Sequence, residues 1–216
     1  MAKVFLSAGH GGSDAGAIAN GLYEKTVNLN TLLACKKELE RHGVTVVCSR
    51  SKDENDPVSE EVKEANTSGA DIAVSFHANA GGGDGFEAFY YDISAKGKKL
   101  AGLCEKHVEA LGQNSRGIKT GNHLWFIKNT TMTAVLVESF FLDNAKDKCI
   151  GDTIAEHTAF GVAYAKAILE YLGITYKENK QASKVYRVQV GAYKDKSNAE
   201  AVKKQLMKAG FGAIIV

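Results

Sequence analysis

Two histidines and one glutamate stand where apolar runs of the sequence end. His10 follows VFLSAG, His77 follows IAVSF, and Glu138 interrupts the run AVLVESFF. Ligands of open α/β sheets bind beyond the carboxyl ends of the strands, so we expect these three side chains to meet at one edge of a sheet. A fourth polar residue, Glu24, lies in the segment NGLYEKT, just before a predicted helix.

These residue types suit a zinc hydrolase. Two imidazoles, one carboxylate and a water make a catalytic zinc site, and a further carboxylate can act as general base on that water. The sequence offers Glu24 and Glu138 for these two roles, and spacing alone leaves open which takes which. Each residue also has an ordinary alternative: a turn or strand-end histidine, a charge at a helix N-terminus for Glu24, or a buried ion pair for Glu138.

The glycines around His10 raise the question of phosphate binding, and the neighbouring residues exclude it. A P-loop needs a lysine after its glycines, and none follows in LSAGHGGSDAG. A dinucleotide-binding fingerprint that begins at Gly9 and Gly11 would need a third glycine where Asp14 stands.

The elements that must position these residues alternate along the chain. Apolar strands between amphipathic helices predict an α/β domain with a central mixed, mostly parallel sheet and helices on both faces. The expected strands are Lys3–Ser7, Val44–Cys48, Asp71–Phe76, Phe86–Tyr91, Leu124–Ile127 and Ala134–Ser139, and the principal expected helices are Thr26–His42, Ala95–Leu111 and Thr153–Leu172. The glycine run 81–85 and the segment 116–123 are expected to be loops that frame a substrate.

The C-terminal part of the chain differs in pattern and in charge. Residues 176–183 are polar and aperiodic, which predicts a linker between a domain over 1–175 and a small β-α-β unit over 184–216. Within that unit we expect strands at 186–190 and 211–216, and a helix that opens at the capping-box pattern of Ser197 and Glu200. Residues 177–216 hold nine Lys and Arg against three Asp and Glu, whereas residues 1–176 hold 18 against 22.

Composition excludes several classes of function. The basic tail could seek a polyanion, but it has few aromatic residues for base stacking and no RNA-binding motif, which argues against nucleic acid. No apolar run approaches the roughly 20 residues of a membrane span. The start MAKV lacks the pattern of a signal peptide, so we expect synthesis in the cytoplasm.

Four strings of the sequence resemble, in order, the motifs of the zinc-dependent N-acetylmuramoyl-L-alanine amidases of the amidase-3 type. They are AGHGGSDAGA, GLYEKTVNLN, GADIAVSFHANAGGGDGFEAFYY and WFIKNTTMTAVLVESFFLDN. The resemblance implies a peptidoglycan hydrolase that uses Zn2+-activated water to cleave the amide between N-acetylmuramic acid and L-alanine. It further implies that His10, Glu24 and His77 bind the zinc and that Glu138 is the catalytic glutamate.

Residues 184–216 resemble half of a SPOR domain, a peptidoglycan-binding fold built from two such halves. A single half leaves strand edges unpaired, so either two chains pair as a homodimer through 184–216 or the chain is a truncated product, and we favour the dimer. With all four site residues in place, we expect a phage endolysin or a sporulation autolysin that acts on the cell wall after release. The alternative is an inactive wall-binding or adaptor protein.

Overall fold

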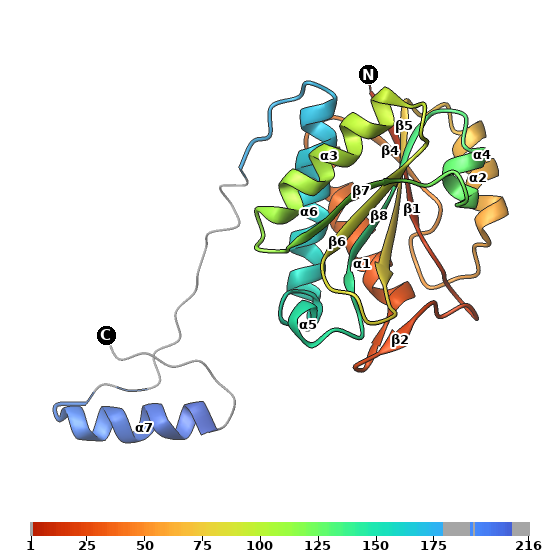
Figure 1. The fold of residues 1–216 in the computed structure, drawn as a ribbon. Coiled ribbons are helices and arrows are strands. Elements are labelled where there is room, and N and C mark those ends of the chain that lie inside the picture. The colour runs from red at the N-terminus through yellow and green to blue at the C-terminus, as the bar shows by residue number, and fades with distance from the viewer. Residues whose placement is uncertain (1, 179–190, 192, 209–216) are drawn as a thin grey trace. The chain divides into compact units, whose positions relative to one another are not determined.

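The computed structural model describes residues 2–178, 191 and 193–208, and the chain divides into two units, Met1–Lys177 and Glu178–Val216 (Figure 1). The described elements are β1 (Lys3–Ala8), β2 (Ile18–Ala19), β3 (Leu22–Tyr23), α1 (Glu24–Arg41), β4 (Thr45–Cys48), α2 (Val58–Thr67), β5 (Ile72–Asn79), β6 (Phe86–Tyr90), α3 (Ala95–Glu109), β7 (Ser115–Thr120), α4 (Trp125–Asn129), β8 (Thr133–Phe141), α5 (Ala145–Gly151), α6 (Ile154–Tyr171) and α7 (Lys196–Lys208).

A six-stranded sheet in the order β4-β1-β5-β8-β6-β7 forms the centre of the first unit. Strands β4, β1, β5 and β8 are parallel, β6 runs antiparallel to β8, and β7 is parallel to β6. The prediction of a mixed, mostly parallel sheet is therefore confirmed. The apolar runs of β1, β5 and β8 occupy adjacent central positions, where both faces of a strand are buried.

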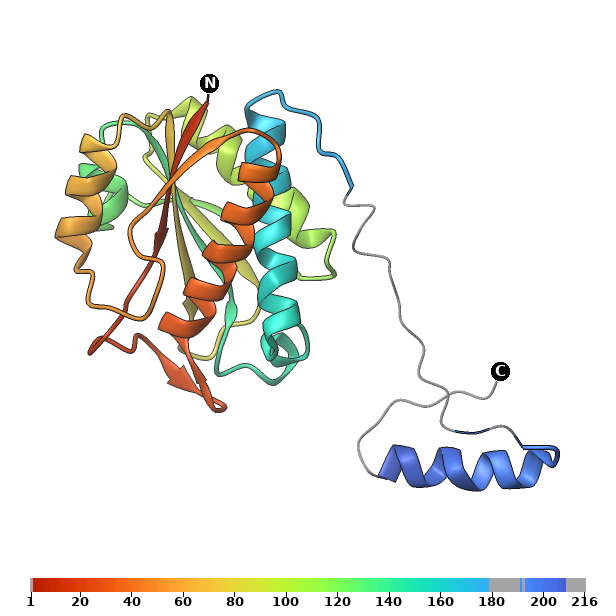
Figure 2. The same ribbon diagram turned by 180° about the vertical axis from the view of Figure 1, so that it is seen from behind.

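Helices cover both faces of this sheet, as predicted (Figures 1 and 2). One face packs against α1, α3 and α6 through a large core that includes Leu32, Leu100 and Tyr164. The other face packs against α2 and α4 through a smaller core that includes Val62 and Phe126. Alternate residues of β5 and β8 belong to the two cores, because successive side chains of a strand point to opposite faces.

Two elements differ from the prediction from sequence. The segment 116–123, expected to be a loop, largely forms the edge strand β7, whose half-exposed residues SRGIKT show no apolar alternation. The expected strand 124–127 is instead the start of helix α4, in which Phe126 and Ile127 are buried and Trp125 is 55% exposed. A strand would send Phe126 and Ile127 to opposite faces, whereas a helix turns both toward α2.

Helix α7 is the described element of the second unit. Its start is held by Asp195, whose Oδ1 accepts hydrogen bonds from the backbone N–H and the hydroxyl of Ser197. The strands expected at 186–190 and 211–216, and with them the homodimer contact, lie outside the described residues. Among the described helices, none combines the length and hydropathy that crossing a bilayer requires.

Candidate metal centre

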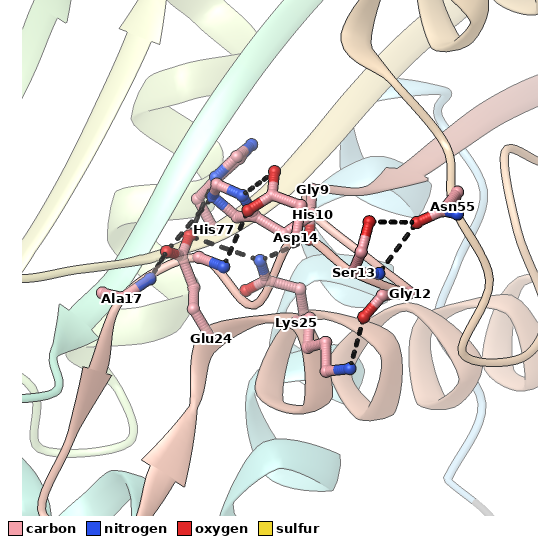
Figure 3. Close-up of polar contacts among 12 residues, drawn as sticks. Gly9, His10, Gly12, Ser13, Asp14, Ala17, Glu24, Lys25, Asn55 and His77 are labelled. Atoms are coloured by element: carbon pink, nitrogen blue, oxygen red, sulfur yellow. Dashed lines mark hydrogen bonds and ion pairs between the residues drawn. The ribbon is translucent and has the colours of Figure 1, made fainter.

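Three different parts of the first unit bring His10, Glu24 and His77 together (Figure 3). His10 lies in the turn that follows β1, His77 lies near the end of β5, and Glu24 is the first residue of α1. One donor atom from each residue lies within 4.8 Å of the other two. Strands β1 and β5 are hydrogen-bonded neighbours, so the two histidines meet because adjacent parallel strands end at the same edge.

The carboxylate of Glu24 joins the two imidazoles. Its Oε2 lies 3.2 Å from His10 Nε2, and its Oε1 lies 3.0 Å from His77 Nδ1. The backbone N–H of Ala17 also donates to Oε2, at 2.9 Å. The Glu24 side chain is only 7% exposed, and its place in the first turn of a helix favours a negative charge.

The turn after β1 fixes the orientation of the His10 ring. His10 itself has a φ of 65°, in the left-handed region that residues with a side chain rarely adopt. Its Nδ1 lies 2.9 Å from Asp14 Oδ2, which leaves Nε2 toward Glu24. Such a carboxylate behind an imidazole is the usual way of fixing the ring of a metal-binding histidine.

Two glycines allow the three side chains to approach this closely. A Cβ on Gly9 would stand 2.1 Å from Cε1 of His77, inside the imidazole ring's contact distance. A Cβ on Gly16 would stand 2.6 Å from Glu24 Oε2, and the φ of Gly16 is +64°. Gly9 and Gly16 therefore allow the backbone to lie directly against the site residues. The sequence pattern alone could not distinguish this role from turn formation.

Mutual contacts shift the protonation of all three groups. The hydrogen bond that His10 Nε2 donates to the Glu24 carboxylate is the main cause that raises the pKa of His10 to about 9. Burial opposes ionisation of Glu24, but the hydrogen bonds from both histidines together hold the pKa of Glu24 well below its ordinary value. Burial likewise opposes charge on His77, yet Glu24 raises the pKa of His77. The carboxylate is thus ionised and surrounded by imidazoles.

Glu138 lies beside this group on the neighbouring strand. In the β5–β8 ladder it pairs directly with His77, so the two side chains share a face of the sheet. Its Oε2 is buried and has no hydrogen-bond partner among the described residues. Burial is the main cause that raises the pKa of Glu138 to about 7. All four residues singled out from the sequence therefore meet in one place.

Arg50 is a supporting residue that sequence reasoning missed. It is 2% exposed and lies behind the His10 turn, where its guanidinium donates to the carbonyl oxygens of Ala8, at 2.9 Å, and Lys25, at 2.7 Å. It thereby connects the end of β1 to the first turn of α1. Arg50 follows β4 by two residues, so the strand-end rule that selected the histidines could also have found it.

The donor set fits a zinc ion. Two imidazoles and one carboxylate match the protein ligands of catalytic zinc sites, which keep a further position open. The unpartnered Oε2 of Glu138 faces no competing hydrogen-bond donor among the residues that the structure describes. A buried acceptor without a partner is costly unless a ligand or water completes it.

The chain is similar to known proteins over its whole length. The Amidase_3 family model, described as N-acetylmuramoyl-L-alanine amidase, matches residues 4–170, and a SPOR domain model matches residues 163–216. The chain is 34% identical to the N-acetylmuramoyl-L-alanine amidase CwlM of Bacillus licheniformis and 33% identical to the sporulation-specific N-acetylmuramoyl-L-alanine amidase of Bacillus subtilis, in each case over 100% of this chain and 85% of the relative. The catalytic domain of CwlV, an N-acetylmuramoyl-L-alanine amidase from Bacillus (Paenibacillus) polymyxa var. colistinus, matches 81% of this chain and 100% of its own, with a TM-score of 0.75 and 34% identity.

Gly9→Ala tests the close approach of β1 to His77. The added methyl group displaces the imidazole, so we expect zinc affinity to fall at least about tenfold by isothermal titration. Gly102→Ala is the matched control, because a Cβ there, in α3, meets nothing within 4 Å; we expect it to keep zinc affinity and to stabilise the fold by about 0.5–1 kcal/mol. Zinc binding by Gly9→Ala at wild-type strength would contradict the close contact.

Arg50→Met tests the support behind the His10 turn. The variant removes the guanidinium that donates to the carbonyl oxygens of Ala8 and Lys25, so we expect the free energy of unfolding to fall by about 3 kcal/mol in urea denaturation. Lys63→Met, which removes an ammonium group paired with Glu60 on the exposed side of α2, where the two side chains are 70% and 52% exposed, should have a much smaller effect. Equal effects of the two substitutions would show that Arg50 is not a structural support.

Proposed function

The chain belongs to the amidase-3 family of N-acetylmuramoyl-L-alanine amidases, and from that premise we propose that His10, Glu24 and His77 hold a zinc ion and that Glu138 is its catalytic glutamate. The protein is a peptidoglycan hydrolase that cleaves the amide between N-acetylmuramic acid and L-alanine. The observation that carries the assignment of roles is the unpartnered Oε2 of Glu138 beside the cluster of two histidines and a glutamate.

The division of labour between the two glutamates follows from their contacts. Glu24 accepts hydrogen bonds from both imidazoles and from backbone N–H groups, so its oxygens are directed into the cluster. When bound, zinc supplies a Lewis acid that polarises the scissile carbonyl and makes water a better nucleophile near neutral pH. Glu138 has an oxygen free for proton transfer, so it takes a proton from the attacking water and delivers it to the amine that leaves.

The surroundings of Glu138 suit this exchange of protons. A general base works best when its pKa lies near the operating pH, and burial raises the pKa of Glu138 to about 7 against the opposing charge of His77. The neighbouring strands fix its backbone on both sides, because β8 lies between β5 and β6. The side chain is therefore positioned by the sheet rather than by a mobile loop.

The competing function is an inactive wall-binding or adaptor protein. Such a protein would have no use for an ordered group of two histidines and two glutamates at one sheet edge. We propose that the enzyme acts on the cell wall after release from the cytoplasm, as a phage endolysin or as a sporulation autolysin. Residues 184–216 would then add affinity for peptidoglycan, in line with the SPOR match.

Glu138→Gln separates catalysis from metal binding. The amide keeps the shape of the side chain but cannot accept the proton, so we expect zinc content to stay at the wild-type level while dye release from labelled cell walls falls by about 10²–10⁴-fold. Glu170→Gln is the control, since that carboxylate binds Lys106 and His107 on the surface of the helical layer. Retained activity of Glu138→Gln, or loss of its zinc, would refute the assigned role.

The homodimer remains a prediction from the sequence. If the unit over 184–216 completes itself with a second copy, the full chain should scatter light as a dimer at micromolar concentration, and a chain that ends at residue 177 should be monomeric. A monomeric full chain under these conditions would exclude pairing through the tail.

A further inference from the structure

A row of charged side chains crosses the sheet and continues beyond the candidate metal centre. His77 on β5 pairs in register with Glu138 on β8, and Glu138 pairs with Glu87 on β6. Directly paired residues of adjacent strands share a face of the sheet. The row ends on edge strand β7, from which Arg116 and Lys119 reach Glu87. Glu87 and the two basic residues are not among the groups that the proposed mechanism uses.

Glu87 anchors the two cations. Its side chain is only 8% exposed, and its Oε1 accepts hydrogen bonds from Arg116 Nε and from Lys119 Nζ, each at 2.6 Å. Burial opposes its ionisation, but these two partners hold the pKa of Glu87 below its ordinary value. One carboxylate thus binds two cations, while Asp84 and Asp147 act on Arg116 through their charge, without a hydrogen bond to it among the described residues.

The unused hydrogen-bond donors of the two cations remain accessible. The side chain of Arg116 is 41% exposed and that of Lys119 is 40% exposed. Arg116 donates to Glu87 through Nε alone, and among the described residues its Nη1 and Nη2 have no hydrogen-bond partner. Its guanidinium lies over the ring of Phe141, 5.3 Å from the centroid, which limits its rotation. A guanidinium held in this way presents a fixed pair of donors to an incoming carboxylate.

The spacing of the row matches the substrate of the proposed reaction. Adjacent strands lie about 4.8 Å apart, so β7 is about 10 Å from the strand of Glu138. Because Arg116 and Lys119 bind Glu87 on β6, their charged groups lie closer to Glu138 than their own strand does. A carboxylate on the second residue of the leaving peptide lies within about 7 Å of the scissile nitrogen. The glycan side offers no such group, because the lactyl carboxyl of muramic acid is already consumed in the scissile amide.

We propose that Arg116 and Lys119 form a subsite for a free carboxylate of the stem peptide, on the leaving-group side of the scissile bond, with Glu87 as the residue that positions them. This inference rests on the proposed amidase function and deepens it, because it makes the charge state of the stem peptide a determinant of specificity. A stem whose carboxylate is amidated loses the charge that the subsite recognises.

The test compares two forms of one substrate with the full-length chain. Purified peptidoglycan sacculi are used either with free stem carboxylates or after amidation of those carboxylates with carbodiimide and ammonia, and the initial rate of appearance of L-alanine amino termini is measured. We expect the wild type to hydrolyse the free form about tenfold faster, the size expected for one lost charge-assisted hydrogen bond. Arg116→Gln and Lys119→Gln should each bring this ratio toward one by slowing only the free form.

Two further variants separate recognition from structural support. Arg116→Lys keeps the charge but loses the planar pair of donors, so its ratio should fall between those of the wild type and Arg116→Gln. Lys106→Gln is the matched control, because it removes a lysine that binds Glu170 in the helical layer, and it should leave the ratio unchanged. Thermal unfolding of each variant checks that the fold is retained. If one of Arg116→Gln and Lys119→Gln fails to fold, the other still tests the subsite.

The outcomes distinguish this inference from the function on which it rests. A wild type that hydrolyses both wall forms at the same rate would overturn the subsite while leaving the amidase function intact. So would glutamine variants that slow both forms by the same factor, as loss of mere support for Glu87 would do. A wild type that releases no L-alanine termini from either form would refute the amidase function itself, and the subsite with it.

Discussion

The contact between the Glu24 carboxylate and the two imidazoles is the interaction on which the site depends. A buried carboxylate is costly unless hydrogen bonds and opposite charge compensate it. Here the compensation comes from His10 at 3.2 Å and His77 at 3.0 Å, so the ends of β1 and β5 and the start of α1 must meet for the charge to be tolerated. The same contacts that make the carboxylate tolerable also gather three ligands for a cation. Folding and metal binding therefore impose the same geometry.

Contacts within the protein hold the backbone around this site in place. Gly9 leaves room for the His77 ring, and the buried Arg50 connects the carbonyl of Ala8 to that of Lys25. Asp14 holds the far side of the His10 ring. Preorganisation of this kind reduces the rearrangement needed when a ligand binds.

Charged residues on neighbouring strands continue from this contact across the sheet. The β5–β8 and β8–β6 ladders place His77, Glu138 and Glu87 side by side, and β7 adds its cations at the edge. Helices α2 and α4 pack on this face through Val62, Phe126 and Ile127. Hydrolysis and recognition of the stem peptide thus become properties of neighbouring strands on a rigid scaffold.

The sequence revealed the central strands and the residues at their ends, because long apolar runs such as IAVSF leave few alternatives and His77 or Glu138 stands out against them. It did not reveal β7, since an edge strand with sequence SRGIKT is paired on one side only and needs no apolar alternation. It misassigned residues 124–127, where the burial of Phe126 and Ile127 against α2 outweighs the strand propensity of the local sequence. The role of Glu87 depends on its register opposite Glu138, which pairs strands 51 residues apart in the chain. Local patterns carry no information about that register.

We expect one zinc ion to be held jointly by His10, Glu24 and His77, with Glu138 beside it. Anomalous scattering measured on both sides of the zinc absorption edge, on crystals of the full chain grown with zinc, tests this most directly. We expect a single strong peak at about 2 Å from a ring nitrogen of each histidine and an oxygen of Glu24. A map without a peak between these residues, or with its strongest peak elsewhere in the protein, would contradict it.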